Sequence, residues 1–172
     1  EILLNLDTEE DDEICIGCAG GIDITITKDF DTENVDVDSS FVKILVNGLT
    51  GGHSGAEIHK GLGNSNKILN ALMKNLDAKY NIRICEIKGG NLRNAIPRES
   101  YSVIQIKNQD YSDIKNEIYN FFNSNKIIYN DLDPNFSISI SNCKEEYKPL
   151  GKVDHKNIID CLDACPNGVF LM

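Results

Sequence analysis

The 172-residue sequence contains no run of about 18 apolar residues, so it predicts no membrane-spanning helix. Its first residues lack the basic and then apolar pattern of a secretory signal peptide. It also lacks internal repeats and low-complexity segments, and its 41% hydrophobic content is ample for a packed core. These absences predict a folded, cytoplasmic protein that does not contact a membrane.

Basic residues are too few to form a basic stripe. The chain has 17 lysines and arginines against 27 aspartates and glutamates, which gives a formal net charge of −10. A surface with this charge repels nucleic acids and anionic membranes. We therefore expect no nucleic-acid partner, and a small molecule or another protein as the ligand.

The cysteines do not form the pattern of a disulfide scaffold, because such secreted proteins are shorter and poorer in core residues. We expect reduced thiols. The spacing Cys15-x-x-Cys18 is that of half a zinc site, but no second half follows, so structural zinc is the weaker interpretation. The six cysteines are Cys15, Cys18, Cys85, Cys143, Cys161 and Cys165.

Hydrophobic periodicity over residues 41–143 predicts the order strand, helix, strand, strand, helix, strand. The last strand alternates cleanly, and both helices carry apolar residues at spacings near 3.6. Gly89-Gly90 between the middle strands predicts an antiparallel hairpin with a long loop. This β-α-β-β-α-β order is that of an α+β, ferredoxin-like sandwich with two helices on one face of four strands. The expected strands are 42–46, 81–88, 101–107 and 136–141, and the expected helices are 55–79 and 112–123.

The two ends of the chain resemble each other more than either resembles the middle. Apolar runs at both ends are typical of strands buried in an α/β sheet, and the acidic segment 29–40 is a candidate boundary. We therefore expect residues 39–144 to be a domain inserted into another, of which 1–38 and 145–172 are pieces. The missing initial methionine and the apolar run at the end suggest an excised piece of a larger protein. The expected elements of the flanks are strands at 1–6, 14–17, 22–27 and from 168, and a helix at 153–165.

The glycine-rich stretch 50–61 lies at a predicted strand-to-helix junction. Ser54-x-x-Glu57 fits a capping box, which would place His53 beside free backbone N–H groups that can bind a carboxylate or an oxyanion. A loop histidine can also be merely solvated. As an alternative, the same stretch approximates a nucleophile elbow with Ser54 as the nucleophile, and a triad would then need His155 from the other unit.

The predicted hairpin loop 89–99 offers Arg93, Asn94 and Arg98 as donors to a carboxylate or an amide. It can equally be a stiff connection with solvated arginines. Asp7 precedes an acidic turn, where a carboxylate is usually solvent-facing, and a metal role for it would need further ligands.

Five motifs, in this order, resemble the bacterial aminoacyl-histidine dipeptidases of the carnosinase type. These enzymes belong to the di-zinc aminopeptidase, carboxypeptidase and deacylase superfamily. The motifs are NLDTEE at 5–10, GCAGG at 17–21, GLTGGHSG at 48–55, IHKG at 58–61 and NAIPRE at 94–99.

The resemblance implies an α/β catalytic domain with two zinc ions, interrupted by a ferredoxin-like lid that mediates homodimerisation. It implies that Asp7 ligates one zinc ion and that His53 polarises the scissile carbonyl and its oxyanion, often from the partner subunit. Asn94 and Arg98 are implied to contact the dipeptide substrate. The other ligands and the general base belong to family segments missing here, so we expect this piece alone to be inactive. The competing hypothesis is a binding and dimerisation module without catalysis.

Overall fold

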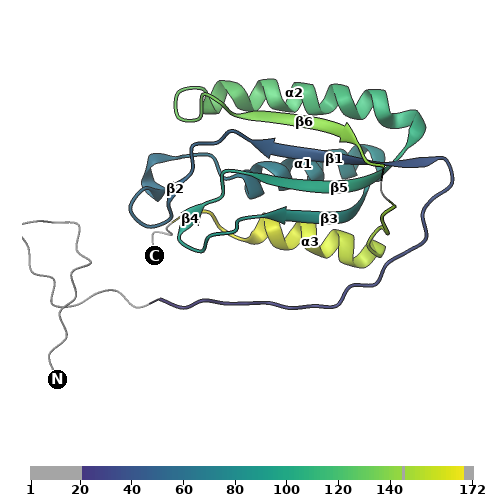
Figure 1. Ribbon diagram of the computed structural model, residues 1–172, viewed down its shortest axis with the longest axis horizontal. Helices are drawn as coiled ribbons and strands as arrows, with labels where there is room; N and C mark the ends of the chain where they lie inside the picture. The colour runs from purple at the N-terminus through teal and green to yellow at the C-terminus, as the bar shows by residue number, and fades with distance from the viewer. Residues whose placement is uncertain (1–20, 145, 169–172) are drawn as a thin grey trace, which may run out of the picture.

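The computed structural model describes residues 21–144 and 146–168, and its centre is a four-stranded antiparallel sheet (Figure 1). The strand order is β3-β5-β1-β6, and every neighbouring pair is antiparallel. The predicted hairpin is confirmed as the β3–β5 pair. The strands are β1 (Ser39–Asn47), β3 (Arg83–Gly89), β5 (Ser100–Lys107) and β6 (Ser137–Asn142).

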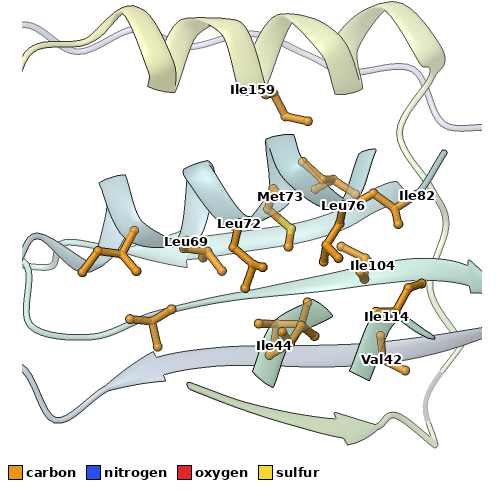
Figure 2. Close-up of a cluster of buried hydrophobic side chains, with 14 of the residues drawn as sticks. Val42, Ile44, Leu69, Leu72, Met73, Leu76, Ile82, Ile104, Ile114 and Ile159 are labelled. Carbon is orange, nitrogen blue, oxygen red and sulfur yellow. The ribbon is translucent and has the colours of Figure 1, made fainter. Parts of the chain in front are cut away.

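Helices α1 (Ser65–Tyr80) and α2 (Tyr111–Tyr129) pack on one face of this sheet, which confirms the predicted ferredoxin-like α+β fold. Alternate residues of β1 point into the layer between sheet and helices, because successive side chains of a strand point to opposite faces. On α1 the buried residues recur every three or four positions. The core shown in Figure 2 includes Val42, Ile44, Leu69, Leu72, Met73, Leu76, Ile104 and Ile114.

Helix α1 begins at Ser65, well after the start predicted at residue 55, and Ser54 is not its cap. Asn64 is the N-cap, and its side-chain oxygen accepts from the backbone N–H groups of Asn66 (3.0 Å) and Lys67 (3.3 Å). The predicted capping box is therefore wrong as a helix start. Gly61, in the left-handed region at φ 73°, ends the short 3-10 helix η1 (Ile58–Lys60) and separates it from α1.

The strand predicted at 22–27 is also wrong. These residues are extended but unpaired, and the side chains of Ile22, Ile24 and Ile26 are 89%, 81% and 84% exposed. An alternating segment becomes a strand only when another strand accepts its hydrogen bonds, and the described part of the chain supplies none here. The strands predicted at 1–6 and 14–17 lie outside the described residues, as does nearly all of the one predicted from 168.

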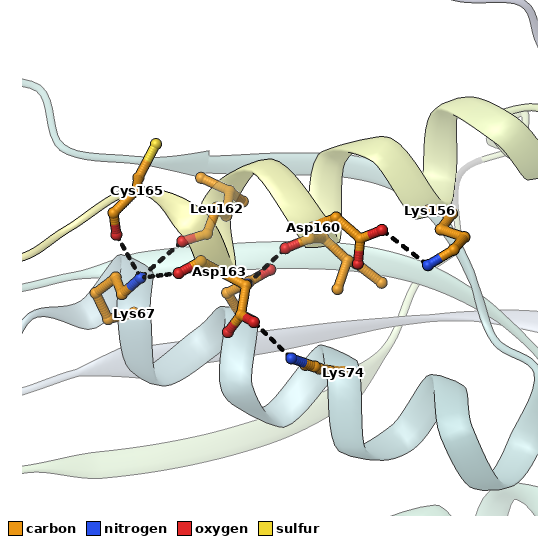
Figure 3. Close-up of polar contacts among 9 residues, drawn as sticks. Lys67, Lys74, Lys156, Asp160, Leu162, Asp163 and Cys165 are labelled. Carbon is orange, nitrogen blue, oxygen red and sulfur yellow. Dashed lines mark hydrogen bonds and ion pairs between the residues drawn. The ribbon is translucent and has the colours of Figure 1, made fainter.

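The predicted helix at 153–165 is confirmed as α3 (Lys152–Ala164), which packs along α1 and beside β3. Lys67 of α1 joins the two helices: its Nζ donates to the carbonyls of Leu162 (2.8 Å), Asp163 (3.0 Å) and Cys165 (2.7 Å) (Figure 3). Lys74 adds an ion pair to Asp163. In this chain α3 thus packs on the sandwich, and the predicted domain boundaries at residues 38 and 144 stay predictions.

Candidate functional site

A cleft of about 860 Å³ lies between the loop that precedes α1 and the loop that joins β3 to β5. A small second sheet, formed by β2 (Gly52–His53) and β4 (Ala95–Ile96), contributes to its wall. His53, Asn94 and Arg98 all line the cleft. The structure therefore brings together three of the four site residues predicted from the sequence.

The β2–β4 pairing sets His53 next to Asn94. His53 pairs with Ala95, and the N–H of Ser54 donates to the Asn94 carbonyl over 2.9 Å. A Cβ at Gly52 would lie 2.9 Å from both Glu57 Oε2 and a methyl carbon of Leu62, so a larger residue there would displace the ends of these two side chains. The pair of glycines before His53 thus allows the close approach that builds the cleft wall.

The imidazole of His53 is held by its own turn. Its Nδ1 accepts from the backbone N–H groups of Gly55 (3.1 Å) and Ala56 (3.0 Å). A nitrogen that accepts carries a lone pair, so the proton of the neutral ring lies on Nε2. The predicted free N–H groups are thus occupied by His53 itself, and the exposed Nε2–H is the donor that this turn offers to a ligand.

Glu57 fixes the backbone of His53. Its Oε2 accepts from the His53 N–H over 2.8 Å, and its Oε1 lies 2.7 Å from Lys60 Nζ. The hydrogen bond from Lys60, followed by that from the His53 backbone, holds the pKa of Glu57 below its usual value. The glutamate of the predicted capping box therefore does reach back, but it secures His53 and not the start of α1.

The opposite wall carries residues that sequence reasoning missed. Lys88 and Tyr101 face each other across the β3–β5 ladder and line the cleft. The Tyr101 hydroxyl donates to Glu86 over 3.0 Å, and Lys43 Nζ lies 3.8 Å from the centre of its ring. The sequence predicts only that both residues lie in neighbouring strands. It does not show that the loop between these strands forms a cleft beside them.

Of the two candidate arginines, only Arg98 belongs to the cleft. It is exposed and lies beside Gly51, which adopts the left-handed conformation at φ 68°. Arg93 is paired with Asp23. Arg98 is therefore the one of these two arginines that lines the cleft.

Residues 44–130 match the M20 family described as the peptidase dimerisation domain. The chain belongs to this family. It is 37% identical to the cytosol non-specific dipeptidase of Escherichia coli (strain K12), over 98% of this chain and 35% of that protein. The crystal structure of the aminoacylhistidine dipeptidase from Vibrio alginolyticus superimposes with a TM-score of 0.81 at 26% identity, over 84% of this chain and 30% of that one.

The chain thus spans about a third of the length of these dipeptidases. The resemblance inferred from the five motifs is confirmed at the level of the family and of the fold. The roles implied for single residues stay predictions.

His155, which lies in α3 outside the matched residues, is not a partner for Ser54. Its side chain is buried against β3, where Nδ1 accepts from the N–H of Ile84 over 3.0 Å, and Nε2 lies 3.1 Å from Asp77 Oδ1. Burial lowers the pKa of His155, although the Asp77 carboxylate opposes that shift. The ring is buried, its Nδ1 is used by the backbone of β3, and His155 does not line the cleft, so the structure does not assemble the alternative Ser54 triad.

Within residues 21–144 and 146–168, no group of three or more histidine, cysteine, aspartate or glutamate side chains could hold a metal ion. Asp7, the predicted zinc ligand, lies outside the described residues, as do Cys15 and Cys18. Cys85, Cys161 and Cys165 are free thiols, as predicted, and burial raises the pKa of Cys85 to about 12. The same part of the chain has no helix long and apolar enough to cross a membrane.

Proposed function

We propose that this chain is the lid-containing part of a cytosolic zinc dipeptidase that hydrolyses Xaa-His and related dipeptides. One observation carries the proposal: the turn at 53–57 fixes Nδ1 of His53 and leaves Nε2–H available in a cleft that also holds Asn94 and Arg98. The names of the two relatives, both dipeptidases, support the reaction class.

His53 is proposed to stabilise the oxyanion that forms when the peptide carbonyl is attacked. A donor that is oriented before the reaction stabilises developing charge without reorganisation in the transition state. The two N–H groups on Nδ1 supply that orientation, because a ring flip would break both hydrogen bonds. The Nε2–H therefore keeps its direction whether or not substrate is bound.

Asn94 and Arg98 are proposed to bind the dipeptide. A guanidinium can hold a carboxylate through two parallel hydrogen bonds, and a carboxamide can pair with a peptide group. A volume of about 860 Å³ is in the range of small-molecule sites. The charged side chains that line the cleft are Lys88, Arg98 and Glu99, and Lys88 is paired with Glu86 over 2.7 Å, so Arg98 is the cation proposed to receive the anionic end of a dipeptide.

Zinc is proposed as the cofactor, two ions per subunit of the longer protein, with Asp7 as one ligand. The described residues do not form a metal site, so the remaining ligands must come from other parts of that protein. What the described residues contribute is the binding of the substrate and the donor for its oxyanion.

The test is His53→Ala in the longer protein. We expect kcat to fall about 10²- to 10³-fold, as for loss of one oxyanion donor, with an unchanged zinc content. His59→Ala is the matched control, because His59 is exposed in the same loop. Wild-type turnover of the His53 variant would remove the proposed role.

Asp7→Asn tests the metal assignment separately. A carboxamide is a poorer ligand than a carboxylate, so we expect the variant to lose zinc when its metal content is measured. Full zinc occupancy in this variant would contradict the assignment.

The second candidate is a dimerisation and binding module without catalysis, which the description of the matched family as a dimerisation domain supports. The encoding reading frame distinguishes the two. A continuous frame with a histidine-containing metal motif upstream supports the peptidase, and a frame limited to these residues supports the module.

A further inference from the structure

Asp133 connects the two ends of the loop that carries His53. It lies in the turn between α2 and β6, and only 1% of its surface is exposed. Its Oδ1 accepts from the N–H of Thr50 over 2.7 Å, and its Oδ2 accepts from the N–H of Gly63 over 2.8 Å. Thr50 enters the loop and Gly63 leaves it, so one carboxylate holds both stems.

The turn around Asp133 is itself fixed. The Asp133 N–H donates to the Tyr129 carbonyl over 2.7 Å, and the Asp133 carbonyl accepts from Phe136 over 3.0 Å. The Thr50 hydroxyl donates to the Leu132 carbonyl over 2.7 Å. Gly48 touches this turn so closely that a Cβ there would lie 2.0 Å from the carbonyl oxygen of Asn135.

The loop at 50–63 needs such an anchor, because glycine has the greatest backbone freedom of any residue. It contains Gly51, Gly52, Gly55, Gly61 and Gly63, and its ends are close, as in an Ω-loop. A carboxylate is costly to bury unless hydrogen bonds compensate for lost hydration. The two amides provide that compensation, so the carboxylate and the loop stems stabilise each other.

We propose that Asp133 is a positioning residue for His53. By fixing Thr50 and Gly63 it limits the loop to the conformation in which the turn at 53–57 closes on His53 Nδ1. Nε2–H then keeps a fixed direction in the wall of the cleft. The catalytic consequence rests on the proposed function, whereas the structural link to the imidazole does not.

Asp133→Asn is the informative variant, because a carboxamide has nearly the same shape but only one oxygen to accept hydrogen bonds. One loop stem then loses its acceptor. Asp131→Asn is the matched control: it removes the same charge two residues away, at an exposed position of the same turn.

The first measurement is the ¹⁵N NMR spectrum of the His53 ring in this chain at neutral pH. In the wild type we expect one unprotonated nitrogen, Nδ1, and one protonated nitrogen, Nε2. In Asp133→Asn the two signals should move towards each other, because both tautomers become populated, while Asp131→Asn keeps the wild-type pattern. A purely stabilising carboxylate would leave the ring signals unchanged in the folded variant, and that result would overturn the proposal.

The second measurement is kinetic and uses the longer protein. We expect Asp133→Asn to lower kcat about 10- to 100-fold with KM within about twofold, since a misplaced donor affects mainly the transition state. If His53→Ala has full activity while Asp133→Asn still changes the ring signals, the proposed function fails and the positioning role stands. If the ring signals and kcat both stay at their wild-type values, the positioning role fails.

Hydrogen exchange of the wild-type chain keeps the test decisive even if Asp133→Asn does not fold. Protected Thr50 and Gly63 amides support the link between the two loop stems. Exchange of these two amides at the rate of unstructured peptide would overturn it.

Discussion

His53 uses its two ring nitrogens for different purposes. Nδ1 closes a backbone turn, and Nε2 is left to donate to a ligand. A serine or asparagine at this position could accept from the same N–H groups. Its shorter side chain would not place a donor as far from the backbone as Nε2–H of the imidazole. A histidine therefore suits both the turn and the role proposed for Nε2–H.

His155 shows the opposite use of a histidine. It is 4% exposed and accepts a backbone hydrogen bond from Ile84 at the edge of the sheet. A protonated ring could not accept that bond, and Arg83 adds to the desolvation that lowers the pKa of His155. The folded chain thus binds this proton less readily than the unfolded chain does.

This difference predicts a pH-dependent stability. Because the pKa of His155 is lower in the folded state, its contribution is complete above the unfolded value of 6.5 and is lost as pH falls below it. We expect the melting temperature to drop between about pH 7 and pH 5, and His155→Gln to reduce that drop. Thermal unfolding followed by circular dichroism measures it.

The matched control for this prediction is His59→Gln, which changes an exposed histidine. It should keep the full wild-type pH dependence. A His155→Gln variant with the same pH dependence as the wild type would contradict the prediction. The drop in melting temperature at low pH would then come from the aspartate and glutamate side chains alone.

Among the elements, α3 is held to the sandwich by polar contacts as much as by apolar ones. Lys67 places a positive charge at the C-terminus of α3, where the helix dipole and the unpaired carbonyls both attract it (Figure 3). Asn70 donates to the Ile159 carbonyl over 3.0 Å farther along the same helix. These contacts orient α3 along α1.

Lys67→Met should weaken this attachment while it keeps the apolar part of the side chain. We expect a loss of about 1–2 kcal/mol in the free energy of unfolding, measured in urea, because a charged donor to several carbonyls is removed. Lys156→Met is the control, since its exposed ion pair to Asp160 on α3 contributes about 0.5 kcal/mol or less. Equal losses in the two variants would contradict a special role for Lys67.

At the scale of the whole molecule, β6 is an edge of the four-stranded sheet, with α2 beside it. The end of α2 exposes Ile127 and Ile128, whose side chains are 83% and 70% exposed, and Leu132 follows in the turn. An unpaired edge and exposed apolar side chains together favour association with another copy. The family is described as a peptidase dimerisation domain, and we predict that two copies meet at this edge.

Ile127→Glu tests this interface. We expect the wild-type chain to be a dimer by light scattering and the variant a monomer, because a carboxylate is costly to bury in an apolar contact. Val153→Glu places the same charge at an exposed apolar position of α3 and should stay dimeric. A dimeric Ile127→Glu would place the interface elsewhere.

Local sequence patterns were sufficient for the order of the main helices and strands within residues 41–143. The alternation in β6 and the 3.6-residue spacing in α1 and α2 depend on neighbours within a few residues, and the structure confirms these three elements, although α1 begins at Ser65 and not at residue 55. Local patterns were insufficient where a contact from a distant part of the chain changes the local structure. The start of α1 is one such case, because Gly63 is held by Asp133, 70 residues away, and Asn64 then becomes the cap.

Periodicity is a property of neighbouring residues, so it was enough to predict the ferredoxin-like fold, and the resemblance of five short motifs to a known family pointed to His53, Asn94 and Arg98. Long-range packing was needed to show that these three share one cleft, that Nδ1 of His53 is occupied, and that His155 is buried elsewhere. It also revealed Asp133, which lies 83 residues from Thr50. No local pattern encodes such a pair, since the contact exists only once α2 and β6 have packed beside β1.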